Sequence, residues 1–342
     1  MSLIKKTMYL IFFIITSFGS FYLVKIYSEK NTQISLDARV EKLRVGFGLQ
    51  PTSMLTILAI QNGYFKRHNL DIIVHHYPSG KRALKEGLKS NTIDIASTAD
   101  IGFWGQVNAI PDMKIITALT SNGNLNRIVA REDSGITSPH DLIGKKIATQ
   151  SNSAVHFFLH RFLDVHEIHR VTNQKIIFMK AEQLVDALKN KRIDAFSMRE
   201  PFISQAKKVL GDKAIIFDAP GIYEQYGLLV AKEGYLKSHK NAIIKYLLAL
   251  NDAKNYYLSH KEYAQHIIAE YLGADIQVIQ ESLEGTKCLI SLNDPLRILL
   301  GSQYAWMSKE VFKQVEKFDI DYYIDSEPME SLFPQRVYKN YD

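Results

Sequence analysis

The sequence predicts an α/β protein of two lobes, followed by a helical C-terminal region. The chain has 342 residues, which is more than one hydrophobic core usually holds. Short apolar runs alternate with helical segments, an order typical of parallel sheets with crossover helices. The alternation begins near residue 43, restarts near residue 138 and gives way to long amphipathic stretches after residue 228.

The N-terminus has the pattern of an export signal. Lys5 and Lys6 precede an apolar stretch over residues 8–24, and basic residues before such a run orient it with the N-terminus in the cytoplasm. Small residues inside the run offer a weak cleavage site, so residues 1–27 are either a signal peptide or a signal-anchor. The apolar run continues past that site to the lower limit for a spanning helix, which favours an uncleaved anchor. Residues 28–42 read as a polar linker.

Composition excludes several classes of protein. The chain is 46% hydrophobic with a formal net charge of +6, and it contains no long Lys/Arg run of the kind that a nucleic-acid-binding protein shows. Cys288 is the one cysteine, so no intrachain disulfide is possible and no cysteine-based zinc spacing exists. We expect no nucleic-acid partner, no metal and no cofactor.

The first lobe is expected to begin over residues 43–128. Its strands and helices alternate, and Asn62-Gly63 is a pair that ends helices. The predicted strands cover residues 43–47, 70–74, 93–96 and 114–119, and the predicted helices cover 53–61, 80–89 and 100–107.

The second lobe is expected over residues 129–226, and the chain then returns to the first lobe over 227–342. Ser138-Pro139 predicts the start of a short helix, because proline favours the first helical position. The predicted strands of this lobe cover 145–149, 175–178, 193–196 and 214–217, and its helices cover 153–165, 181–189 and 201–210. A return strand at 228–231 precedes amphipathic helices at 239–258 and 296–317.

Four motifs in this order resemble substrate-binding proteins of ABC importers for aliphatic sulfonates, taurine, nitrate and thiamine-pyrimidine precursors. Residues 58–65 (LAIQNGYF) look like the phrase A-x-x-x-G-Y-F, and 84–96 are similar to A-L-x-x-G-x-x-D-I-A. Residues 134–147 (SGITSPHDLIGKKI) are the most specific match, and 193–201 contain I-D-A followed by Glu-Pro.

The resemblance implies a periplasmic-binding-protein type II fold, with two Rossmann-like lobes that close by hinge motion on a ligand in the cleft between them. It implies a monomer that captures a small solute outside the cytoplasm, in the periplasm, and delivers it to an ABC permease in the inner membrane. Two departures leave the solute open: Arg199 stands where the family often has Trp, and Ser151-Asn152-Ser153 stands where it often has Gly-Ser.

Candidate ligand-binding residues follow the strands. Ligands of open α/β sheets gather beyond the carboxyl ends of the strands, where free N–H groups and helix dipoles favour anions. Short hydroxyl and amide side chains can bind ligand there or merely cap helices. The candidates at four such junctions are Gln50, Thr52, Ser53, Thr98, Asp100, Asn122, Ser151, Asn152 and Ser153.

Arg199 and Glu200 lie at a further strand-to-helix junction. Arg199 could clamp a sulfonate or carboxylate with two parallel hydrogen bonds, or form a structural salt bridge with Glu200 or Asp194. Tyr226 could supply a stacking surface or belong to the core.

His156 lies one turn into the helix after Ser153 and could contact solute. His156 and His160 are four residues apart, a spacing that can bind a metal, but no carboxylate stands at ligand spacing from either.

We therefore expect a binding protein for a small organic anion. A thiamine pyrimidine precursor is the alternative solute. A pyrimidine-synthase-like enzyme would require a cysteine-rich signature that Cys288 alone cannot provide, and no other catalytic motif is present. A sensory ligand-binding module is compatible with the tether.

Overall fold

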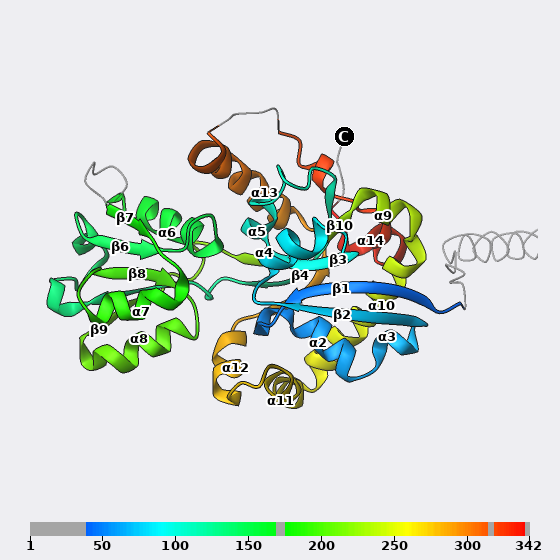
Figure 1. The fold of residues 1–342 in the computed structure, drawn as a ribbon, viewed down its shortest axis with the longest axis horizontal. Helices are drawn as coiled ribbons and strands as arrows, with labels where there is room; N and C mark the ends of the chain where they lie inside the picture. The colour runs from blue at the N-terminus through cyan, green and yellow to red at the C-terminus, as the bar shows by residue number, and fades with distance from the viewer. Residues whose placement is uncertain (1–38, 169–174, 314–317, 339–342) are drawn as a thin grey trace, which may run out of the picture. The chain divides into compact units, whose positions relative to one another are not determined.

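The computed structural model describes residues 39–168, 175–313 and 318–338, and these residues form two β-sheets flanked by helices (Figure 1). The six-stranded sheet has the order β11-β4-β10-β3-β1-β2, and the five-stranded sheet has the order β7-β6-β8-β5-β9. The predicted export segment lies outside the described residues. Within the described part of the chain, no helix combines the length and apolarity needed to cross a bilayer.

The six-stranded sheet organises the first lobe. β1 pairs in parallel with β2 and β3, whereas β10 runs antiparallel to β3 and β4, and β11 runs antiparallel to β4. Its strands are β1 (Glu41–Gly48), β2 (Leu70–Tyr77), β3 (Ile95–Ala99), β4 (Met113–Asn122), β10 (Gln225–Lys232) and β11 (Lys287–Ser291).

The five-stranded sheet organises the second lobe. β6 pairs in parallel with β7 and β8, and β5 runs antiparallel to β8 and β9. Its strands are β5 (Arg127–Arg131), β6 (Lys146–Thr149), β7 (Lys175–Phe178), β8 (Ala195–Met198) and β9 (Ala214–Phe217).

Helices connect the strands of each lobe. The helices of the first lobe are α2 (Met54–Gln61), α3 (Tyr64–Arg67), α4 (Gly80–Arg82), α5 (Asp100–Trp104), α9 (Glu233–Ser238), α10 (Lys240–Ser259), α11 (Lys261–Leu272), α12 (Ile276–Leu283), α13 (Asp294–Met307) and α14 (Glu327–Leu332). Those of the second lobe are α6 (Ala154–Val165), α7 (Ala181–Lys189) and α8 (Phe202–Leu210). Short 3-10 turns precede α2 and β6, and π-helical turns continue α4 and α13.

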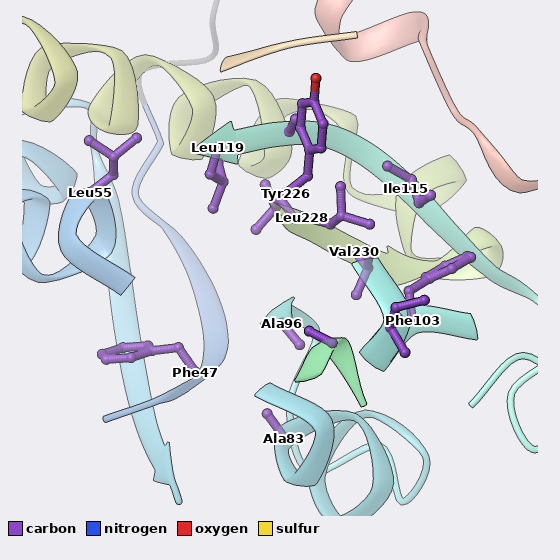
Figure 2. Packing of buried hydrophobic residues seen from close by; sticks show 14 of the residues in the cluster. Phe47, Leu55, Ala83, Ala96, Phe103, Ile115, Leu119, Tyr226, Leu228 and Val230 are labelled. Atoms are coloured by element: carbon purple, nitrogen blue, oxygen red, sulfur yellow. The ribbon is translucent and has the colours of Figure 1, made fainter. Parts of the chain in front are cut away.

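The core of the first lobe forms because its central strands are buried on both faces, as strands covered by helices on both sides are. Every residue of β4 is buried. Figure 2 shows side chains of β1, β3, β4 and β10 gathered with Leu55 of α2, Phe103 of α5 and Ala83 in one cluster.

Successive residues of the second sheet belong to two different clusters, because neighbouring side chains on a strand point to opposite faces. Ile128 packs into the large cluster that includes the first lobe, whereas Val129 packs into a separate cluster with α7 and α8. Ala195 and Phe196 divide in the same way.

The chain changes sheet twice. It leaves β4 at Asn122 and enters β5 at Arg127, and it leaves β9 at Phe217 and enters β10 at Gln225. The helix α13 also reaches the second lobe, where Trp306 packs against the ring of Phe157 on α6 at a centroid distance of 5.2 Å.

One expectation about the elements is wrong. The sheets are mixed rather than parallel, because β5 and β10, the strands that follow the two crossings between the sheets, run antiparallel to their neighbours. In the mainly helical region after residue 228, β11 adds an edge strand beside β4 that the sequence analysis did not predict. Its five residues are too few to show the period-2 pattern clearly between two helices.

Candidate functional site

A cavity of about 590 Å³ lies between the two lobes. Its walls are loops at the carboxyl ends of β1, β2, β3 and β4 from the first sheet and of β6 and β8 from the second. This is the position at which open α/β sheets bind ligands.

Ten of the thirteen candidate residues line this cavity. They are Gln50, Thr52, Ser53, Thr98, Asn122, Ser151, Asn152, Ser153, Arg199 and Glu200. The other three candidates, Asp100, His156 and Tyr226, do not line it. The four loop junctions chosen from the sequence therefore all contribute to one cavity.

Several of the lining hydroxyl and amide groups have structural partners. Ser53 Oγ donates to the carbonyl of Gly48 over 2.8 Å. Ser153 is the N-cap of α6: its Oγ accepts from His156 N and donates to Gln150 O. Helix and loop capping therefore accounts for part of the polarity of the cleft wall.

The side chain of Asn122 also forms hydrogen bonds within the protein. Its side-chain amide donates to Glu284 O over 2.7 Å and to Thr286 Oγ1 over 2.8 Å, and its Oδ1 accepts from Asn124 N over 2.7 Å. The residue is 2% exposed. Each hydrogen-bonding group of this side chain is thus engaged inside the protein.

Arg199 differs from these residues, because its side chain makes no hydrogen bond or ion pair with any of the residues 39–168, 175–313 and 318–338. Its side chain lines the cavity and is partly exposed there. Burial lowers the pKa of Arg199, and the neighbouring Tyr223 partly opposes that effect. The guanidinium nevertheless stays charged at any physiological pH.

Neither Glu200 nor Asp194 forms the salt bridge with Arg199 that the sequence allowed, because both carboxylates have other partners. Asp194 pairs with Arg131 Nη2 at 3.2 Å and accepts from Lys146 N. Glu200 accepts from Ser204 N over 3.1 Å and faces Arg127.

The structure adds lining residues that the sequence analysis did not select. Lys81 lines the cavity from the loop after β2, and its Nζ donates to Asn152 O over 3.2 Å. Ser97 Oγ and Asn124 Oδ1 are buried lining atoms without a hydrogen-bond partner among the described residues. The signal for Lys81 was Ser79-Gly80 at the start of the predicted helix over 80–89, since short residues at the start of a helix also marked the four chosen junctions.

Asp100 lies behind the cavity wall, where it is 0% exposed. Its carboxylate accepts hydrogen bonds from the Tyr223 hydroxyl and from Tyr226 N, the latter over 3.0 Å. Burial raises the pKa of Asp100 to about 6, and these hydrogen bonds oppose part of that rise. These hydrogen bonds hold the segment that returns from the second lobe, which contains Tyr223 and Tyr226, against Asp100.

The two helical histidines pack against other groups. His156 contacts the rings of Trp306 and Phe178, and His160 Nε2 lies 3.2 Å from Asp164 Oδ2. In the part of the chain that the structure describes, no group of three His, Cys, Asp or Glu side chains is arranged to hold a metal ion.

Sequence comparison supports the resemblance to binding proteins. A family model described as NMT1/THI5 like matches residues 50–264, more than half of the chain. A putative aliphatic sulfonates-binding protein of Bacillus subtilis is 22% identical over 255 residues, which cover 73% of this chain and 76% of the relative.

Solved structures share the fold. The periplasmic aliphatic sulphonate binding protein of Escherichia coli superposes with a TM-score of 0.71 at 21% identity, covering 84% of this chain and 92% of that chain. The alkanesulfonate-binding protein of Xanthomonas axonopodis pv. citri, bound to MOPS, gives 0.66 at 18% identity, covering 88% and 99%. The predicted periplasmic-binding-protein fold and the resemblance to this group of proteins are confirmed.

Proposed function

The chain belongs to the NMT1/THI5-like family, and from this premise we propose that it is the extracytoplasmic solute-binding component of an ABC importer. It captures a small organic anion, of the sulfonate, taurine or nitrate kind, in the cleft between its lobes. The sulfonate-binding names of its sequence relative and of its structural neighbours support this proposal.

The main evidence that the solute is an anion is the guanidinium of Arg199 in the cavity wall, which has no partner among the residues that the structure describes. A partly buried charge without a partner is costly, and an anionic ligand would supply the missing partner. Arginine also presents parallel N–H donors that match the oxygens of sulfonate, carboxylate or nitrate.

The helix α6 adds to this preference. Its N-terminal loop, Ser151-Asn152-Ser153, lines the same cavity, and the N-terminus of a twelve-residue helix favours negative charge. We assign this loop and Arg199 to the ligand's acidic group, with Gln50, Thr52, Thr98 and Glu200 around it.

The test is a thermal-shift screen of the full-length protein against sulfonates, taurine, nitrate, carboxylates and pyrimidines. A ligand at one hundred times its dissociation constant should stabilise the protein by about 2.7 kcal/mol. A stabilising anion supports the proposal, and mass spectrometry of the released ligand should recover it unchanged, as expected of a binding protein. If a pyrimidine is the only compound that stabilises the protein, the proposal of an anionic solute is wrong and the protein binds a thiamine precursor instead.

Arg199→Ala is the corresponding variant. Loss of a charge-assisted hydrogen-bonding partner should weaken binding of the identified anion by about 10- to 100-fold, measured by isothermal titration calorimetry. Arg192→Ala is the matched control, because Arg192 is an exposed arginine of the same lobe that pairs with Asp186 and does not line the cavity. Equal affinities of the two variants for the anion would show that Arg199 does not bind the ligand.

We further propose that the protein works as a monomer in the periplasm, tethered to the inner membrane through residues 8–24, and that it delivers its solute to an ABC permease. Cell fractionation with and without residues 1–27 tests the tether. Co-purification with a permease supports delivery, whereas co-purification with a receptor would favour the sensory alternative.

A further inference from the structure

Lys81 is a second cation in the wall of the cavity, on the lobe opposite Arg199. It belongs to α4, directly after β2 of the six-stranded sheet, whereas Arg199 follows β8 of the five-stranded sheet. Its Nζ donates to Asn152 O over 3.2 Å, so this first-lobe side chain already reaches the loop of the second lobe.

That hydrogen bond does not neutralise the charge of Lys81. The acceptor is a neutral carbonyl, and no carboxylate of the described residues forms an ion pair with Lys81. Burial lowers the pKa of this amine, and the neighbouring Lys85 lowers it further. An anion beside Nζ would offset both effects.

The other charged groups of the cavity wall are either paired or exposed. Arg82 pairs with Glu86 at 2.7 Å, and Arg127 pairs with Asp218 at 2.7 Å and faces Glu200 at 3.8 Å. Glu182 and Glu281 line the cavity too, but both are exposed, whereas Lys81 and Arg199 are partly buried. Since solvent screens exposed charges more strongly, the two cations dominate the interior.

The position of Lys81 is fixed by close backbone packing. A Cβ added at Gly80 would lie 2.6 Å from Ser97 O and 2.7 Å from Thr98 Cα, so only glycine lets this loop lie against β3. Ser79 Oγ then caps the turn by accepting from Arg82 N. The loop therefore holds the Lys81 backbone against the cavity wall.

We propose that Lys81 is a ligand-binding and specificity-determining residue, and that the site is built for a solute with two negative charges, one held by Lys81 and the other by Arg199. A cavity of about 590 Å³ has room for such a solute between the lobes. This inference rests on the proposed function, because it names the class of anion that the binding protein takes.

The experiment compares two probes by isothermal titration calorimetry at pH 7: ethanesulfonate, which carries one negative charge, and sulfoacetate, which carries two. The full-length wild-type protein should bind sulfoacetate at least tenfold more tightly. Lys81→Met keeps an unbranched side chain only one atom shorter and removes its charge, so it should weaken sulfoacetate binding by about 10- to 100-fold and ethanesulfonate binding by less than threefold.

Arg82→Met is the matched control, since Arg82 is the next residue, also lines the cavity and is already paired with Glu86. It should leave the ratio of the two affinities unchanged. Lys81→Arg should restore most of the sulfoacetate affinity, and thermal unfolding without ligand checks that each variant is folded.

The outcomes separate the two proposals. A wild-type protein that binds neither these probes nor any other anion overturns the proposed function and this inference with it. A wild-type protein that binds ethanesulfonate or taurine as tightly as sulfoacetate overturns the inference alone. Equal losses in Lys81→Met and Arg82→Met also overturn the inference and leave the proposed function intact.

Discussion

At the scale of single residues, Asp100 shows how a side chain beside a ligand site can serve the fold instead. It stands at a strand-to-helix junction, as Thr98 does, but its carboxylate is turned into the protein and accepts from Tyr223 and from Tyr226 N. Burying a carboxylate disfavours its ionised form, which is why the pKa of Asp100 rises to about 6.

The raised pKa of Asp100 predicts how the stability of the protein depends on pH. Between about pH 4 and 6 the folded protein holds a proton on Asp100 that the unfolded chain has released, so stability should fall as pH rises through this range and level off above it. The free energy of unfolding of the wild type minus that of Asp100→Asn should decrease by up to about 3 kcal/mol between pH 4 and 6.5. Denaturant unfolding at fixed pH values measures the difference, and parallel profiles for the two proteins would contradict it.

At the scale of elements, the edge strand β11 depends on the loop that precedes it. Asn122, at the end of β4, donates to Glu284 O and Thr286 Oγ1 just before β11 begins at Lys287. The same side chain accepts from Asn124 N in the segment that leads to the second lobe. One buried amide therefore joins β4, the start of β11 and the first crossing between lobes.

Asn122→Ala should therefore act mainly on stability. It leaves Glu284 O, Thr286 Oγ1 and Asn124 N without their partner, and a loss of about 1–3 kcal/mol in the free energy of unfolding is expected from denaturant titration. Affinity for the anion, measured at a temperature where both proteins are folded, should change less than tenfold. A large affinity loss with unchanged stability would instead place Asn122 among the ligand contacts.

At the scale of the whole described molecule, closure of the cleft would have to move the two lobes about the segments 123–126 and 218–224. Trp306 of α13, in the first lobe, packs against α6 of the second lobe. Its ring centroid lies 5.0 Å from that of His156 and 5.2 Å from that of Phe157. The chain has two tryptophans, and the other, Trp104, is fully buried in the first lobe.

Trp306 should report closure. In Trp104→Phe the emission of Trp306 is observed alone, and addition of a stabilising anion should shift its wavelength or intensity as the α6 contacts rearrange. Trp306→Phe is the control and should show no comparable change. An unaltered Trp306 emission at saturating ligand would mean that α13 and α6 move as one body.

The sequence by itself determined the order of most elements and the family, although it did not predict the strands β5 and β11. Hydrophobic alternation located the ends of most strands to within three residues. Motifs such as 134–147 indicated the family. Both signals depend only on residues that are neighbours in the sequence. It also located four of the loops that form the cavity, since ligands of these sheets gather beyond the strand ends.

Only the tertiary structure decided which side chains remain available there. Hydrogen bonds between residues far apart in the chain engage Asn122 with Thr286 and Asp100 with Tyr223. Salt bridges with distant arginines give Asp194 and Glu200 partners other than Arg199. The same packing brings Lys81 to the loop at Asn152, 71 positions away. Whether a polar residue binds ligand or supports the fold depends on such distant partners, which no local pattern in the sequence specifies.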